Sequence, residues 1–274
     1  MPGAALDTFE QIAGQLWPRL YRTAIALCRN RDDAQDLVQD TLVQAMRKWN
    51  QFEGRSDPAT WLYTIAARLC HRRRRRRAGE PLKIEPLVEL IPSATGPLAD
   101  VSAALDPHET ATRREVSRVV TQAIAELPTG FRVPLVLVDI AELKTSEAAR
   151  ILGIKETTVK TRVHRARLKL RKVLAEQLPS RAPSPCSHSR QVCLDLLQAK
   201  QDALDRKVPF SFSDGELCAR CSSVMATLDV AAEACRTIGL DARPTLPASS
   251  AKTLRPPEKG HLRRRRAAAA AARG

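Results

Sequence analysis

The sequence predicts an all-α protein: two small helical domains joined by a Pro-rich linker, then a small helical extension that contains cysteines. Apolar residues recur at helical spacing through most of the chain, as at Val159, Val163 and Ala166. No segment alternates apolar and polar residues over a convincing length. The stretch 133–140 is rich in β-branched residues, but it lies between helical segments and is expected to be a buried helix.

Prolines mark the domain boundaries. Between residues 78 and 107 they are too dense for a long helix, and a second break falls at 179–185. About thirty linker residues would reach roughly 100 Å when extended. The predicted units are an N-terminal domain (6–77), a linker (78–106), a middle domain (107–178), an extension (186–240) and a disordered basic tail (241–274).

The N-terminal domain contains a helix from about Asp32 to Trp49 with an apolar stripe on one side. Its other side is acidic and rich in amides. In so basic a chain this face is expected to meet a protein, although an ordinary solvated face remains an alternative. A second helix runs from about Thr60 and ends in an arginine run at 72–77, which is expected to lie against a polyanion. The acidic face carries Asp33, Asp36, Gln39 and Asp40.

The middle domain is predicted to begin at a capped helix. Asp106 is placed to cap, Pro107 to take the first helical position and Glu109 to complete a capping box. Further helices are expected at about 131–141, 145–152 and 156–176. The last two form a helix-turn-helix with Gly153 at a left-handed corner.

The second helix of this motif is strongly basic. Residues 155–172 contain eight Lys or Arg and a single acidic residue, Glu156. This excess of positive charge favours phosphate binding over the alternative of a merely solvated charged face. The side chains that point away from the apolar stripe are expected to reach base edges and phosphates in a major groove. They are Thr157, Thr158, Lys160, Thr161, Arg162, His164 and Arg165, of which His164 would serve equally well as a surface residue without a role.

Composition supports an intracellular partner of nucleic acid. The formal net charge is +15, and no apolar run or N-terminal leader predicts a membrane span or secretion. The expected location is therefore the cytoplasm. Seven cysteines, mostly late in the chain, favour reduced thiols or a metal over a secreted disulfide framework.

Two segments resemble a known family. RDDAQDLVQDTLVQAMRKW with FEGRSDPATWLYTIAARL resembles region 2 of the extracytoplasmic-function (ECF) subfamily of bacterial sigma-70 factors, and residues 127–174 resemble region 4. The resemblance covers roughly two-fifths of the chain. It implies a promoter-recognition subunit of RNA polymerase that is not an enzyme, has no catalytic residues and requires no cofactor. A separate anti-sigma factor is a further expected partner.

The resemblance also implies site residues. Asp33, Asp36, Gln39 and Asp40 would bind the β′ clamp helices of core polymerase, and the basic helix of the middle domain would read the −35 element. Where region 4 usually has serine caps, this chain has Lys144 and Lys155, so Thr145 is expected to cap instead. The −10 element would be held by Phe52, Glu53, Gly54, Arg55, Ser56, Asp57, Arg68, Arg72 and Arg73.

The extension contains Cys218-x2-Cys221, a spacing typical of metal or redox sites. The expected ligands are Cys193, Cys218, Cys221 and His188, and Cys186 and Cys235 are further thiols that a zinc ion could use. The segment 214–217 loosely resembles the zinc-binding anti-sigma domain, but Asp214 stands where that family has His. Zinc, a thiol switch or metal sensor without stable zinc, and simply buried thiols therefore remain open.

Three functions are compatible with the sequence. The first is a sigma factor regulated through its extension. The alternatives are a stand-alone helix-turn-helix regulator, and a thiol- or metal-sensing protein that its basic helices localise to DNA. The acidic helix followed by an arginine-rich one favours the first, because a stand-alone regulator has no need of it.

Overall fold

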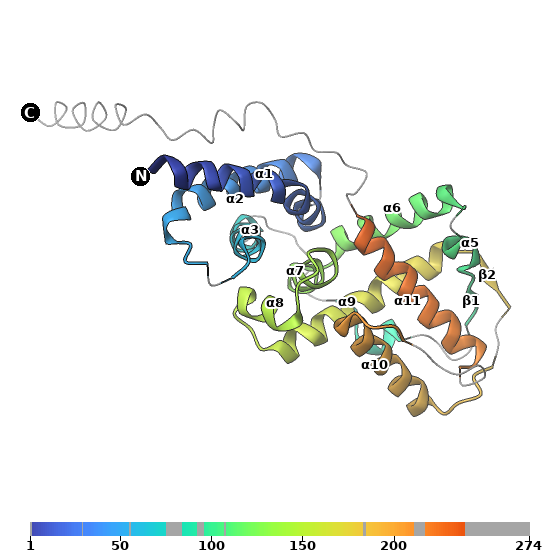
Figure 1. Cartoon of the computed structure of the whole chain (residues 1–274). Coiled ribbons are helices and arrows are strands. Elements are labelled where there is room, and N and C mark those ends of the chain that lie inside the picture. The colour runs from blue at the N-terminus through green and yellow to red at the C-terminus, as the bar shows by residue number, and fades with distance from the viewer. Residues whose placement is uncertain are drawn as a thin grey trace, which may run out of the picture.

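The computed structural model describes residues 2–28, 30–54, 56–74, 84–91, 96–106, 108–182, 185–210 and 217–238. The predicted tail at 241–274, residues 75–77 of the arginine run and Asp214 lie outside these residues. Within them the chain is all-α, as predicted (Figure 1). One short antiparallel pair, β1 (Leu98–Ala99) with β2 (Ser180–Arg181), joins the linker to the end of the middle domain.

The N-terminal domain packs α1 (Pro2–Leu27), α2 (Arg31–Lys48) and α3 (Pro58–Arg74) around one core, with a short turn η1 (Trp49–Gln51) between α2 and α3. Asn30 caps α2 by accepting a hydrogen bond from the Asp33 N–H at 2.7 Å. The Asp57 carboxylate accepts from the Ala59 N–H at 2.7 Å and so caps α3, whose first residue is Pro58.

The middle domain contains α5 (Ser102–Leu105), α6 (Thr110–Glu126), α7 (Thr129–Leu135), η2 (Val136–Ile140), α8 (Thr145–Leu152) and α9 (Glu156–Gln177). The stretch 133–140 is helical and almost entirely buried, which confirms that prediction. Gly153 ends α8 in the left-handed conformation (φ 66°), as the predicted corner between α8 and α9 requires.

Two capping predictions were wrong. Asp106 accepts a hydrogen bond from the His108 N–H at 2.8 Å and so caps a turn, and α6 begins later, at Thr110. Pro107 lies outside the described residues. Thr145 does not cap α8: its hydroxyl donates to Glu156 at 2.6 Å, while the Glu147 carboxylate accepts from the Lys144 N–H at 3.0 Å. The local sequence favours these caps, but in the folded protein both side chains form hydrogen bonds with other groups instead.

The described part of residues 78–106 holds only short elements, namely α4 (Leu87–Leu90), β1 and α5, so the absence of a long helix is confirmed there. It is nevertheless bound to the rest of the protein. Leu90 is fully buried against Leu168 and Leu197, and the Glu85 carboxylate lies 2.5 Å from the Lys169 ammonium. The described linker segment 84–91 therefore packs along α9.

The extension forms α10 (Arg190–Arg206) and α11 (Ala219–Thr237). Helix α11 packs against α6, α9 and η2, and its apolar residues join the main core (Figure 1). At its end the Arg22 guanidinium of α1 donates to the carbonyl oxygens of Arg236 and, at 3.0 Å, Ile238. The extension thus touches both domains. In the described part of the chain, no helix has the length and apolar character of a membrane span.

Candidate polymerase, DNA and metal interfaces

The acidic face of α2 is presented to solvent. Asp36, Gln39 and Asp40 are exposed, whereas Asp33 is half-buried and accepts a hydrogen bond from the Asn30 side chain at 3.1 Å. The opposite side of the helix buries Leu37. The face is therefore available for contact with another protein, and its partner remains a prediction.

An aromatic cluster supports the loop after α2. The Phe52 ring lies 5.1 Å from that of Trp49 and 5.2 Å from that of Trp61, measured between centroids, and Phe9 closes the cluster from α1. Trp61 is half-buried against the core. We did not predict this cluster from the sequence, although three aromatic residues at 49–61 in a chain with 4% aromatics were a usable signal.

The loop beyond Phe52 is open to solvent. Glu53, Gly54, Ser56 and Asp57 are exposed, and Gly54 adopts a left-handed φ of 68° that favours glycine. Arg55 lies outside the described residues. The stacked aromatics fix one end of this loop and the Asp57 cap fixes the other, so its exposed groups are held in place.

Two of the predicted −10 arginines face the middle domain. Arg68 and Arg72 of α3 are exposed, and with Arg150 of α8 they line a cleft of about 710 Å³. Among the described residues that line it, none is acidic. The Arg73 side chain lies outside the described set. This cleft is positively charged and suits an anion such as phosphate.

The predicted −35 residues are not all equally accessible. Thr157 and Thr161 are exposed at the start of α9, whereas His164 is only 14% exposed and its Nε2 lies 2.9 Å from the Asp205 carboxylate of α10. The predicted contact of His164 with DNA is not available in this arrangement. The remaining predicted residues are half-buried: Thr158, Lys160, Arg162 and Arg165.

In the second half of α9, basic residues form ion pairs within the protein. This corrects the expectation that all eight basic residues of the segment face phosphate. Arg167 is 4% exposed and lies 2.7 Å from both Asp139 and Asp205. Burial lowers the pKa of Arg167, but the two carboxylates outweigh it and raise that pKa above its ordinary value. Lys169 and Lys172 pair with Glu85. Charge pattern alone could not reveal these partners.

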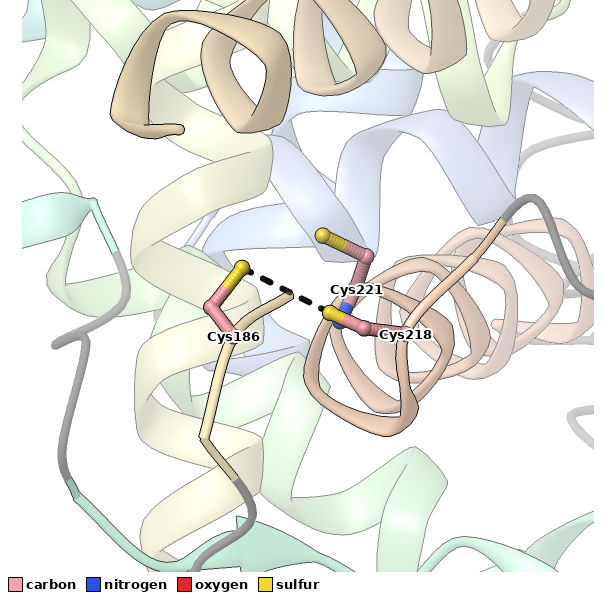
Figure 2. Close-up of side chains that lie close together, drawn as sticks. All are labelled: Cys186, Cys218 and Cys221. Atoms are coloured by element: carbon pink, nitrogen blue, oxygen red, sulfur yellow. Dashed lines mark hydrogen bonds between the residues drawn. The ribbon is translucent and has the colours of Figure 1, made fainter. Parts of the chain in front are cut away.

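Four cysteines of the extension gather at one point, and Figure 2 shows three of them. The Cys186 sulfur lies 3.1 Å from that of Cys193 and 3.5 Å from that of Cys218, and Cys221 lies 3.7 Å from Cys193. Of the predicted ligands, the structure brings Cys193, Cys218 and Cys221 together and adds Cys186. His188 lines the adjoining pocket, and its backbone N–H bonds to Cys186. Cys235 is buried in the main core instead.

The cysteine cluster has unequal acidity. Burial raises the pKa of Cys218, but hydrogen bonds from the Cys221 backbone, the Cys186 thiol and the Ser187 backbone together lower it to about 6. Burial and the neighbouring sulfurs raise the pKa of Cys221 well above its ordinary value. Cys218 is therefore largely thiolate at neutral pH, the form that binds metals and attacks oxidants.

Comparison with known proteins agrees with this architecture. Residues 13–80 match the family profile of Sigma-70 region 2, and residues 117–170 match that of Sigma-70 region 4. The chain is 32% identical to the ECF RNA polymerase sigma factor SigM of Mycobacterium tuberculosis, over 61% of this chain and 76% of that protein. It is 30% identical to SigW of Bacillus subtilis, over 62% and 90%. The chain belongs to the ECF sigma factors.

A solved structure is also similar. The sigma factor RpoE from Bartonella quintana, in complex with the anti-sigma factor NepR, aligns with 61% of this chain and 96% of its own, with a TM-score of 0.45 and 27% identity. Neither family profile extends beyond residue 170. The cysteine-containing extension of this sigma factor therefore lies outside the matched regions.

As a sigma factor, the protein directs core RNA polymerase to promoters and assists DNA opening, and it is not an enzyme. Its partners are core polymerase and promoter DNA. Membership in the family favours this function over a stand-alone regulator.

Proposed function

We propose that this sigma factor binds the β′ clamp helices of core polymerase through Asp33, Asp36, Gln39 and Asp40. The observation that carries this proposal is the exposed acidic face of α2 in a protein of net charge +15. Helices α3 and α9, which would face DNA, are basic. The proposed polymerase surface and the proposed DNA surfaces therefore carry opposite charges.

The N-terminal domain would open the promoter by binding energy alone. A protein lowers the free energy of melting when it holds an unpaired base and its strand on polar, aromatic and basic groups. The exposed groups of residues 53–57 offer hydrogen bonds to a base edge, and Arg68 and Arg72 offer charge to the backbone. Phe52 shapes this loop through its contacts with Trp49 and Trp61.

The first half of α9 would read the −35 element. In a helix-turn-helix the N-terminal residues of the second helix contact base edges. Thr157 and Thr161 are exposed at that end, and Lys160 makes only a long 3.8 Å pair with Glu156. These groups, with Arg165 for a base or phosphate, support duplex recognition.

Charge reversal on α2 tests the polymerase assignment. We expect the double variant Asp36→Lys with Asp40→Lys to lose co-purification with core polymerase and transcription from a promoter library. The matched control is Glu109→Lys with Glu126→Lys, which makes the same charge change on exposed residues of the middle domain. Equal binding by both variants would contradict the assignment.

The cysteine cluster would hold a thiolate-preferring metal ion such as zinc. Tetrahedral zinc with Zn–S bonds of about 2.3 Å requires sulfurs about 3.8 Å apart, and the observed separations of 3.1 to 3.7 Å fit after a small expansion. The ion would fix the loop at Cys186 to the first turns of α10 and α11. A thiol switch is the second candidate, because the low pKa of Cys218 favours reaction with oxidants.

Location and further partners follow from this role. A sigma factor acts where promoter DNA and polymerase are, so we infer action at the nucleoid. A separate anti-sigma factor remains a proposed partner. Its action would add to regulation through the extension, which contacts both domains.

A further inference from the structure

The two proposed DNA surfaces face each other. Helix α3 of the N-terminal domain contacts α8 of the helix-turn-helix, and Arg68 and Arg72 line the cleft between them with Arg150. Promoter elements two helical turns apart are separated by roughly 70 Å of duplex. This arrangement therefore cannot read both elements at once, and the domains must separate to do so.

Helix α10 of the extension contacts α9 next to the end that is proposed to read DNA. The Asp205 carboxylate is 5% exposed and pairs at once with His164, at 2.9 Å, and Arg167, at 2.7 Å. The Gln201 side chain donates to the His164 carbonyl at 3.3 Å. The oxygens of Asp205 thus bind two groups of α9 that would suit a phosphate.

The position of α10 excludes DNA on this side of α9. Asp202 lies beside Asp205, within 4.8 Å of His164, so two carboxylates face this part of the helix and would repel a phosphate backbone. The Lys207 ammonium donates to the Glu142 carbonyl at 2.5 Å and fixes the end of α10 to the segment before α8. DNA could approach this side of α9 only after α10 moves away.

The other end of the extension holds the N-terminal domain. Arg22 of α1 donates to the last carbonyl groups of α11, at Arg236 and Ile238. A cation at a helix C-terminus is a favourable position because the carbonyl groups there lack partners within the helix. One segment of the chain therefore bonds to both domains across their interface.

We propose that α10 and α11 form an intramolecular clasp that keeps this sigma factor in a closed, inactive arrangement. Asp205 is its contact with the DNA-reading helix, and Arg22 receives its other end. The inference rests on the proposed role of α9 in DNA binding. Release of α10 exposes His164, and separation of the domains opens the cleft that the arginines line.

The substitution Asp205→Asn tests the clasp in the full-length protein. Arg167 keeps both hydrogen bonds to Asp139, at 2.9 and 2.7 Å, so the middle domain retains its buried pair. The control is Asp195→Asn, an exposed residue of the same helix that interacts with Gln191. Both variants gain the same charge, so electrostatics alone predicts equal gains in DNA affinity.

The readout is fluorescence anisotropy with a labelled random-sequence duplex of about two helical turns, at constant salt. We expect Asp205→Asn to bind about five-fold more tightly than Asp195→Asn, the lower end of typical coupling between linked sites. Equal affinities would overturn the clasp.

A second variant changes the net charge in the opposite direction. Lys207→Asn removes a positive charge, yet asparagine tolerates the left-handed φ of 55° at this position and cannot reach the Glu142 carbonyl. Electrostatics predicts weaker DNA binding, whereas release of α10 predicts tighter binding. Weaker or unchanged binding by a folded Lys207→Asn protein contradicts the proposal, even if Asp205→Asn fails to fold.

Hydrogen exchange separates this inference from the proposed function. In Asp205→Asn, amides of α10 should lose protection while those of α2 keep it. Unchanged protection in α10 would also count against the clasp. These measurements need no polymerase. Failure of a released variant, one with tighter DNA binding and lower α10 protection, to program core enzyme would refute the proposed function alone, and unchanged DNA affinity and protection would refute the clasp alone.

Discussion

The Glu85 carboxylate of the linker lies 2.5 Å from the Lys169 ammonium of α9 and 3.5 Å from that of Lys172. These contacts attach the linker to the helix that we propose to read DNA. Together with the burial of Leu90 they dock the linker segment 84–91 on α9 in the closed arrangement. Undocking of this segment is therefore a step that can be followed separately from the release of α10.

Acid should release the linker from α9. The hydrogen bond from Lys169 holds the pKa of Glu85 below its usual value, with burial acting in the opposite direction. A lowered folded-state pKa means that this pair stabilises docking above the unfolded pKa of about 4.5. The stabilisation is lost as pH falls through the folded value.

Hydrogen exchange of residues 84–91, followed from about pH 6 down to pH 3, checks this prediction. Glu85→Gln should already be deprotected at pH 6 and should lose most of the pH dependence. Glu89→Gln, at an exposed position of the same segment, is the control and should behave as the wild type. Identical profiles for all three proteins would show that the ion pair does not hold the linker.

Loss of the buried guanidinium should destabilise the protein strongly. Arg167→Met leaves the largely buried carboxylates of Asp139 and Asp205 without their guanidinium partner, and Asp205 keeps only its contact with His164. Breaking such a pair by removing one partner lowers the free energy of unfolding by about 3 to 5 kcal/mol. Urea titration followed by circular dichroism measures this change.

The matched control for that change is Arg118→Met. Arg118 forms a pair with Glu115 in which both side chains are about 60% exposed, and such solvent-screened pairs contribute little to stability. A similar loss in both variants would mean that the Arg167 site is open to water.

Metal content checks the cysteine cluster. The purified wild type, kept reduced, should contain about one zinc per chain, and Cys193→Ser and Cys221→Ser should each lose most of it. Cys28→Ser, in the N-terminal domain, should retain the metal. Elemental analysis measures the content. Wild-type protein that neither contains zinc nor binds added zinc would favour the thiol switch.

The fold was largely predictable because helical periodicity and corner residues are local signals. Val159, Val163 and Gly153 each act through neighbours a few residues away, and α8 and α9 lie within a residue or two of their predicted bounds. The recognition helix also had enough positive charge to indicate the class of its partner from sequence.

The regulatory contacts could not be read in this way. Asp205 meets Arg167 across 38 positions of the chain, and nothing near either residue predicts the pairing. The fourth sulfur of the cluster depends on the path of the loop before α10, so spacing could not distinguish Cys186 from His188. The sequence pattern of a basic helix face is likewise the same whether its side chains bind phosphate or pair with an acidic residue such as Glu85.

Arg165 should contribute directly to promoter binding. It is half-buried on α9, next to His164, and it follows the exposed Thr161 by one helical turn. If Arg165 contacts a base, Arg165→Ala weakens binding to a promoter duplex by about 1 to 3 kcal/mol and relaxes specificity there; a phosphate contact weakens all sequences alike. Lys169→Ala, whose ammonium already pairs with Glu85, should lose less. Affinities at fixed salt distinguish these cases, and an Arg165→Ala protein with wild-type affinity would remove Arg165 from the DNA interface.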